Sequence, residues 1–229
     1  MPSPDDAVHS SAPIRDVLTE AREAGFLGPG PIETQLEHAE GFAAIARRLD
    51  TDTTAPRILD LGSGGGVPGL VVATTWREPT LVLLESNRLR AEFLRRSVQR
   101  LGLQDRVSVL EERAEAAGRE PDYRAAFDGV LARSFGRPAV VAECAAPLLS
   151  IGGWLVVSEP PPLEDETTAA EQAILGRDVR WPPEGLAQLG LEPAEVVREG
   201  ASYQVLRQAE GCPERFPRRD GVPAKRPLF

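Results

Sequence analysis

Hydrophobic positions are densest between residues 57 and 85, where their pattern predicts a strand, a turn, a helix and a second strand. An apolar run at 58–61 precedes a cluster of five glycines, and a second apolar run at 81–84 ends at Glu85. Short apolar runs bounded by turn residues are typical of strands buried on both faces. Glycines allow a sharp turn at which a ligand can approach the backbone. We therefore expect a β-α-β unit with parallel strands.

The rest of the chain continues this alternation. Helical patterns are found at 14–24, 31–49, 87–101 and 139–149. Strand patterns are found at 106–110, 127–131 and 154–157, and a hairpin at 195–198 and 202–207. In the helix at 87–101, Asn87 is the predicted N-cap, and the expected buried stripe is Leu89, Phe93, Leu94, Val98 and Leu101. The pattern predicts an α/β, Rossmann-like fold with a doubly wound, mostly parallel seven-stranded sheet.

Composition divides the chain into four parts. Residues 1–12 are rich in Pro, Ser and Asp and are predicted to be disordered. Residues 13–50 form a predicted helical cap beside the glycine loop, and residues 51–208 form the main domain. Within it, the Pro- and Glu-rich segment 159–183 is a long connection with a short helix expected at 168–175. Residues 209–229 are a basic, Pro-rich tail, for which prolines favour an extended arm.

Charge and cysteine content limit the class of protein. The 229 residues carry a net charge of -9, which by itself argues against a nucleic-acid partner. However, residues 215–229 hold five bases against one acid. Two cysteines without a CxxC pair and only two histidines predict neither a disulfide framework nor a metal site. The chain shows no membrane span or secretion signal, so we expect a cytoplasmic protein.

The glycine cluster fits two cofactor motifs. Gly64-x-Gly66-x-x-Gly69 matches a dinucleotide fingerprint, and Asp60-x-Gly62-x-Gly64-x-Gly66 matches an S-adenosylmethionine (SAM) loop. Asp60, just before the first glycine, favours SAM, because it can reach a methionine amino group where a dinucleotide site has apolar residues. Glu85 follows at the distance from which an acid can bind ribose hydroxyls. A glycine-rich turn without a ligand is the structural alternative.

Several motifs resemble one family. They are DLGSGGGVPGL at 60–70, LLESNRLRAEFLRRSVQRLGLQDRVSVLEERAE at 83–115, FDGVLARSF at 127–135 and the closing RFPRRDGVPAKRPLF. Together they are similar to the bacterial guanine-N7 methyltransferases of small-subunit rRNA, historically called glucose-inhibited division protein B. The resemblance implies a class I SAM-dependent methyltransferase fold with SAM as cofactor and rRNA, or a precursor of the small ribosomal subunit, as partner.

The motifs and the resemblance assign roles to individual residues. Asp60 is placed at the methionine end of SAM, Glu85 at its ribose, and Ala114 and Glu115 beside its adenine. The predicted cofactor set is completed by Gly62, Gly64, Gly66, Gly69, Leu70, Ser86 and Arg133. By resemblance, Arg133 also faces the methyl-transfer site and positions the substrate; its alternative is a structural ion pair. Phe135 either stacks on a base or belongs to the core.

The basic tail has two interpretations. As an RNA clamp it would bind phosphates through Arg215, Arg218, Arg219, Lys225 and Arg226. As a charged, Pro-rich terminus it would be a disordered, solubilising end.

Guanine N7 carries a lone pair and no proton, so its methylation requires no general base. An enzyme of this kind has to hold the reactants in line.

Two other functions stay open. One is a SAM-dependent methyltransferase for a small molecule or protein, which the acidic charge and Ser158-Glu159 favour. The other is a non-catalytic nucleotide- or RNA-binding module.

Overall fold

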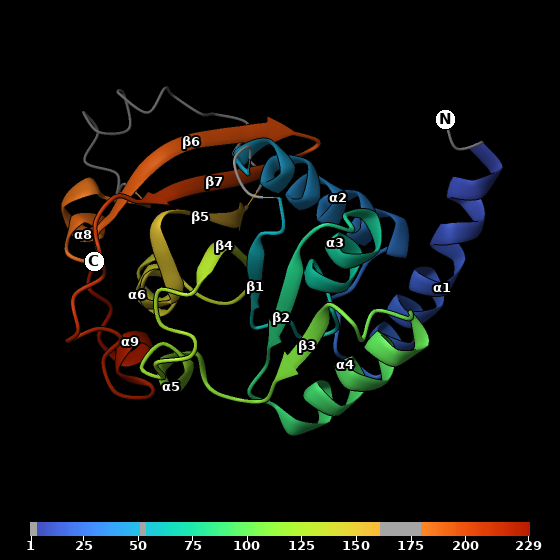
Figure 1. Cartoon of the computed structure of the whole chain (residues 1–229), viewed down its shortest axis with the longest axis horizontal. Helices are drawn as coiled ribbons and strands as arrows, with labels where there is room; N and C mark the ends of the chain where they lie inside the picture. The colour runs from blue at the N-terminus through green and yellow to red at the C-terminus, as the bar shows by residue number, and fades with distance from the viewer. Residues whose placement is uncertain (1–3, 51–53, 161–179) are drawn as a thin grey trace.

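The computed structural model describes residues 4–50, 54–160 and 180–229. Its centre is a seven-stranded sheet with the order β3-β2-β1-β4-β5-β7-β6 (Figure 1). The strands are β1 (Arg57–Leu61), β2 (Thr80–Leu84), β3 (Val107–Leu110), β4 (Phe127–Ala132), β5 (Leu149–Glu159), β6 (Leu191–Glu199) and β7 (Ala201–Gln208). Strands β1 to β5 pair in parallel, and β7 is antiparallel to both β5 and β6. The predicted doubly wound, mostly parallel sheet is confirmed.

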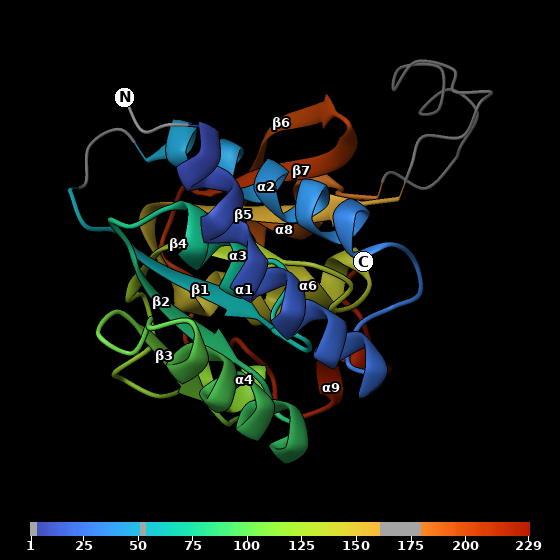
Figure 2. The same ribbon diagram turned by 90° about the vertical axis from the view of Figure 1, so that its right-hand side faces the viewer.

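Helices cover both faces of this sheet (Figure 1). One face carries α1 (Pro4–Glu23), α2 (Ile32–Leu49), α3 (Gly69–Thr75) and α4 (Arg88–Arg100). The other carries α5 (Ala114–Ala117), α6 (Pro138–Ala145), the 3₁₀ turn η1 (Ala146–Leu148), α8 (Pro183–Ala187) and α9 (Val222–Lys225). Figure 2 shows α1 and α2 lying across the first face, where the helical cap was expected.

The protein has one hydrophobic core on each face of the sheet, and the alternation of side chains along each strand explains both. In β1, Ile58 packs into the core beneath α1 to α4, whereas Leu59 and Leu61 pack into the core beneath α5 and α6. All three are fully buried. Because successive side chains of a strand point to opposite faces, a continuous apolar run can bury both.

Helix α4 has its predicted N-cap and is followed by a glycine. The Asn87 side chain accepts a hydrogen bond from the N–H of Arg90 at 3.2 Å, and Gly102 follows the helix with a positive φ of 64°. Phe93, Leu94 and Val98 are buried as expected. Leu89, expected in the same buried stripe, is 66% exposed, so that assignment was wrong.

Three other elements differ from the predictions. Helix α1 starts at Pro4 and runs through Pro13, so residues 4–12, expected to be disordered, are helical. A proline removes one hydrogen bond of a helix and does not have to end it. Helix α6 stops at Ala145 instead of Leu149, because Pro147 cannot continue the hydrogen-bond ladder. Strand β5 begins at Leu149 rather than Trp154. The helix expected at 168–175 lies outside the described residues.

Candidate active site

The glycine loop between β1 and α3 turns through backbone angles that glycine adopts without strain. Gly62, Gly64 and Gly66 have φ angles of 74°, 53° and 94°, in the left-handed region that a Cβ atom disfavours. A Cβ atom at Gly66 would also lie 2.4 Å from Cδ1 of Leu70. Leu70 is fully buried beneath the loop, so it supports the loop and offers no surface to a ligand.

Glu85 follows β2, and backbone N–H groups orient both of its carboxylate oxygens. Its Oε2 accepts a hydrogen bond from Gly64 at 2.9 Å, and its Oε1 accepts one from Asn87 at 2.7 Å. Glu85 lies on a cavity of about 210 Å³, which we call the glycine-loop cavity. The other lining residues are Gly62, Leu84, Ser86, Arg90, Glu112, Ala114, Ser134 and Phe135. Four residues predicted for the cofactor, Gly62, Glu85, Ser86 and Ala114, therefore meet at one cavity.

Asp60 lies beneath the loop and not on the wall of this cavity. It is 1% exposed, and its Oδ2 accepts a hydrogen bond from the N–H of Gly69 at 3.0 Å. A Cβ atom at Gly69 would lie 2.5 Å from the same oxygen. Burial raises the pKa of the Asp60 carboxyl to about 7, and the nearby negative charge of Glu85 acts in the same direction. Asp60 thus anchors the start of α3 to the end of β1.

Arg133, directly after β4, lies on a second cavity of about 350 Å³, which we call the Arg133 cavity. Its Nη2 donates a hydrogen bond to Oε1 of Gln35 in α2. His38, also from α2, lines this cavity, and its buried Nε2 has no hydrogen-bond partner among the residues that the structure describes. Burial, with the charge of Arg133 as a smaller cause, lowers the pKa of His38 to about 4, so this imidazole is neutral at pH 7. The structure places Arg133 outside the lining of the glycine-loop cavity.

Two residues line both cavities. They are Ser134 and Phe135, in the turn that follows β4. Ser134 has a φ of 53°, which is uncommon for a residue with a side chain and typical of functional turns. The Phe135 ring packs on the glycine loop, since a Cβ atom at Gly62 would lie 2.6 Å from its Cδ2. Groups bound in the two cavities would therefore approach each other at this turn.

The segment between α1 and α2 covers the glycine loop from the side of the helical cap. A Cβ atom at Gly65 would lie 2.7 Å from Cγ of Leu27. Phe26 packs edge-on against Phe93 of α4, with ring centroids 5.5 Å apart. The guanidinium of Arg90, which lines the glycine-loop cavity, lies 5.9 Å from the centroid of the Phe26 ring. The segment thus lies over the loop as the cap prediction requires.

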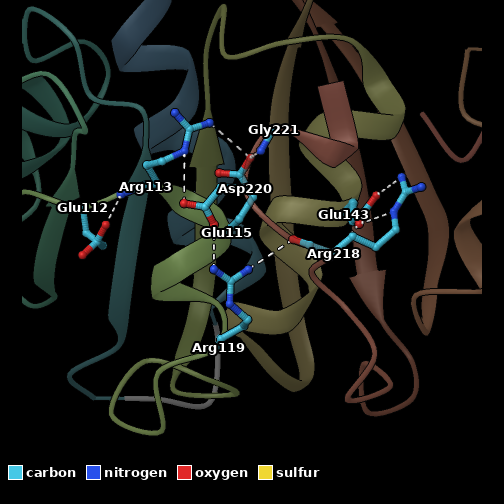
Figure 3. Close-up of polar contacts among 8 residues, drawn as sticks. All are labelled: Glu112, Arg113, Glu115, Arg119, Glu143, Arg218, Asp220 and Gly221. Carbon is cyan, nitrogen blue, oxygen red and sulfur yellow. Dashed lines mark hydrogen bonds and ion pairs between the residues drawn. The ribbon is translucent and has the colours of Figure 1, made fainter. Parts of the chain in front are cut away.

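The basic tail is not the extended arm that its prolines predicted. It contains the short helix α9 and folds back onto α6. Arg218 donates three hydrogen bonds to the carboxylate of Glu143: from its N–H (2.9 Å) and Nε (2.8 Å) to Oε1, and from Nη2 (2.6 Å) to Oε2 (Figure 3). The Glu143 side chain is fully buried. Arg218, predicted to bind RNA, is therefore committed to an internal ion pair.

Glu115 also faces the tail. Its Oε1 accepts a hydrogen bond from the N–H of Gly221 at 2.8 Å, and Arg113 lies 3.3 Å from the same oxygen. Asp220 accepts a hydrogen bond from Arg119 at 2.6 Å (Figure 3). The carboxylate of Glu115 is thus turned away from the expected adenine position, although Ala114 beside it lines the glycine-loop cavity. The other four tail bases predicted to bind RNA, Arg215, Arg219, Lys225 and Arg226, are exposed.

The sequence reasoning missed several residues of the two cavities. Glu112 lies on the glycine-loop cavity, and Trp181 lies on the Arg133 cavity, together with Glu159, which the sequence had indicated only as a sign of a different substrate. A signal existed for Glu112, because it lies just beyond the carboxyl end of the parallel strand β3, where α/β folds bind their ligands. Trp181 lies near the end of the predicted long connection and carried no such signal.

The described residues hold no group of three or more His, Cys, Asp or Glu side chains that could bind a metal ion. Within the same residues, every helix is too short or too polar to cross a membrane.

Comparisons with known proteins show which family the chain is similar to. Residues 37–180 match the family described as GidB, rRNA small subunit methyltransferase G. The ribosomal RNA small subunit methyltransferase G of Rubrobacter xylanophilus is 34% identical over 93% of this chain and 80% of its own length. That of Thermotoga neapolitana is 37% identical over 83% of this chain and 79% of its own length.

Solved structures support the fold. An O-methyltransferase from Bacillus cereus, determined in complex with SAH, superposes with a TM-score of 0.58 at 16% identity, over 86% of this chain and 90% of its own. With both the sequence relatives and the fold in agreement, the chain belongs to the rRNA small subunit methyltransferase G family.

Proposed function

We propose that this chain transfers a methyl group from S-adenosylmethionine to N7 of a guanine in small-subunit rRNA, and that it acts in the cytoplasm. Family membership supports the reaction and the substrate. The observation that carries the cofactor site is the Glu85 carboxylate, which two backbone N–H groups hold at the glycine-loop cavity.

The residues of the glycine-loop cavity fit SAM. Each Glu85 oxygen accepts one backbone hydrogen bond and keeps further acceptor capacity, which the two hydroxyls of a ribose can use. Gly62 leaves bare backbone on the cavity wall, and Ala114 offers an apolar surface for an adenine. Asp60 acts from below by fixing Gly69 and hence the loop. When bound, SAM supplies a methyl group on a positively charged sulfur atom.

The Arg133 cavity fits the acceptor base. N7 of guanine is nucleophilic without losing a proton, so the residues here need to orient the base and exclude water. Arg133 is held in place by Gln35, and Phe135 offers an aromatic face on the wall shared with the glycine-loop cavity. The reaction would take place at the turn of Ser134 and Phe135, which both cavities share.

The test is methylation of small ribosomal subunits from a strain that lacks this gene, with labelled SAM and chemical mapping of N7-methylguanine. We expect a single N7-methylguanine with the wild-type chain, and loss of both SAM binding and methylation with Glu85→Ala. Label that appears only in protein or in small molecules would overturn the rRNA assignment. Normal SAM binding by Glu85→Ala would overturn the cofactor site.

The contribution of the tail is better tested by substitution than by deletion, because Arg218 neutralises a buried carboxylate. Replacing Arg215, Arg219, Lys225 and Arg226 by glutamine should weaken rRNA binding and reduce its dependence on salt, since counterion release scales with the number of phosphate contacts. SAM affinity should not change, as none of the four lines the glycine-loop cavity. An unchanged salt dependence would exclude the tail from RNA binding.

A further inference from the structure

The Arg133 cavity contains a carboxylate that the proposed reaction does not use. Glu159, the last residue of β5, lies on this cavity together with Trp181, Phe135 and Arg133. It does not line the glycine-loop cavity, whereas Phe135 lines both. The carboxylate is therefore on the acceptor side of the site and away from the wall that the two cavities share.

Two neighbours fix the orientation of this carboxylate. Its Oε1 accepts a hydrogen bond from Nε1 of Trp181 at 3.0 Å, and its Oε2 accepts one from Nε of Arg180 at 2.5 Å. The Glu159 side chain is 12% exposed and Trp181 is 6% exposed. Nη2 of Arg180 makes a second, longer contact with Oε1 at 3.5 Å. A carboxylate offers about four acceptor positions, so Oε2 keeps one for a further donor, and the second position on Oε1 holds only this long contact, which a closer donor would displace. The pair of oxygens thus forms a pre-oriented double acceptor beside aromatic rings.

A guanine presents the matching pair of donors. Its N1–H and its 2-amino group lie side by side on the Watson–Crick edge, whereas adenine and cytosine have a ring-nitrogen acceptor there that a carboxylate would repel. Enzymes that act on an unstacked base commonly bind this edge with hydrogen bonds and stack the ring on aromatic side chains. Phe135 and Trp181 provide such surfaces in the same cavity.

The orientation that Glu159 would give a bound guanine also agrees with methyl transfer to N7. N7 lies on the side of the purine opposite the Watson–Crick edge. A guanine whose Watson–Crick edge is bound by Glu159 would therefore turn N7 away from this residue and toward Ser134 and Phe135, which form the wall shared with the glycine-loop cavity. The same contact would select the base and aim its nucleophile.

We infer that Glu159 is a specificity-determining residue that accepts hydrogen bonds from N1–H and the 2-amino group of the target guanine. This inference rests on the proposed function. Trp181 and Arg180 act through Glu159 as positioning residues, because they hold its two oxygens.

The test compares guanosine with inosine at the mapped target position, in small subunits reconstituted with ligated 16S rRNA. Inosine keeps N7, O6 and N1–H and lacks only the 2-amino group. Because a hydrogen bond to a charged group contributes more than a neutral one, the wild-type enzyme should lose about 10- to 100-fold in kcat/KM on inosine. Glu159→Gln should lower kcat/KM on guanosine by a similar factor and remove most of the difference between the two substrates.

Two controls separate recognition from structure. Glu210→Gln removes an exposed acid outside both cavities and should keep the wild-type ratio of guanosine to inosine activity. SAH binding should be equal in the wild type and in Glu159→Gln, as Glu159 does not line the glycine-loop cavity. Arg180→Gln removes one of the two groups that hold the carboxylate but keeps the acceptor itself, so it should lower the preference for guanosine less than Glu159→Gln does.

The outcomes are distinct. Equal wild-type activity on guanosine and inosine would overturn the inference without any variant. The inference would also be overturned if Glu159→Gln preferred guanosine over inosine as strongly as the wild type does. If the wild type methylates neither substrate, the proposed function itself fails.

Discussion

The ion pair between Arg218 and Glu143 gives a strong prediction about stability. The Glu143 side chain is fully buried and that of Arg218 is 26% exposed. Arg218→Met would remove the Nε and Nη2 donors, and within the described parts of the chain the buried carboxylate would keep the backbone N–H of residue 218 as its donor. Breaking a buried ion pair from one side typically costs roughly 3–5 kcal/mol of folding free energy. For a domain of this size, that cost lowers the melting temperature by about 6–20 °C.

The adjacent arginine is a matched control. Arg219 is exposed, so Arg219→Met should change the free energy of unfolding by no more than about 0.5 kcal/mol. Calorimetry and urea unfolding at pH 7 measure both variants. The double variant Glu143→Met/Arg218→Met should recover much of the stability, because replacing a buried pair by apolar side chains is often neutral or stabilising. Equal melting temperatures for the two single variants would refute the structural role of Arg218.

Two further predictions concern the glycine loop. The pKa of Asp60 is raised to about 7 in the folded protein from 3.8, so the folded state binds the additional proton and stability falls as pH rises from about 4 to 7. Asp60→Asn should flatten this fall in urea titrations at pH 5 and pH 7.5, and parallel curves for variant and wild type would contradict it. Gly66→Ala should weaken SAM binding in calorimetric titration, because Gly66 has a φ of 94° and its Cβ atom would lie 2.4 Å from Cδ1 of the buried Leu70, so the loop would have to shift. Gly102→Ala is the control: Gly102 has a φ of 64° and nothing within 4 Å of its Cβ position, so this change should leave SAM affinity unchanged and lower stability by about 1 kcal/mol.

Local patterns in the sequence were sufficient to predict the elements at the centre of the fold. The apolar runs of β1 and β2, the glycines between them and the Asn87 cap depend on neighbouring residues in the chain, and the structure has them where they were predicted. The position of Glu85 at the glycine loop follows from the same unit. Periodicity gives the face of a helix but not how far other elements cover it, which is why Leu89 was assigned wrongly.

Long-range contacts could not be predicted in this way. Arg218 and Glu143 are 75 residues apart in the chain, and Glu115 and Gly221 are 106 apart. The prolines and charges of the tail predicted an extended arm. Its buried partners lie on α5 and α6, far away in the sequence, so the local pattern could not indicate that the tail folds back. The fifth strand was predicted to begin at Trp154, whereas Gly153 lies inside it, where its missing side chain allows the backbone oxygen of Asp128 to approach.

The turn of Ser134 and Phe135 has a consequence for inhibitor chemistry. Because this one turn borders both cavities, an adenosine joined to a purine by a spacer long enough to pass the Phe135 ring would be a bisubstrate ligand. Its second half would bind at the effective concentration set by the spacer, and such linkage can raise affinity about 10²- to 10⁴-fold over either half alone. The length of the best spacer would measure the path that the methyl group has to travel.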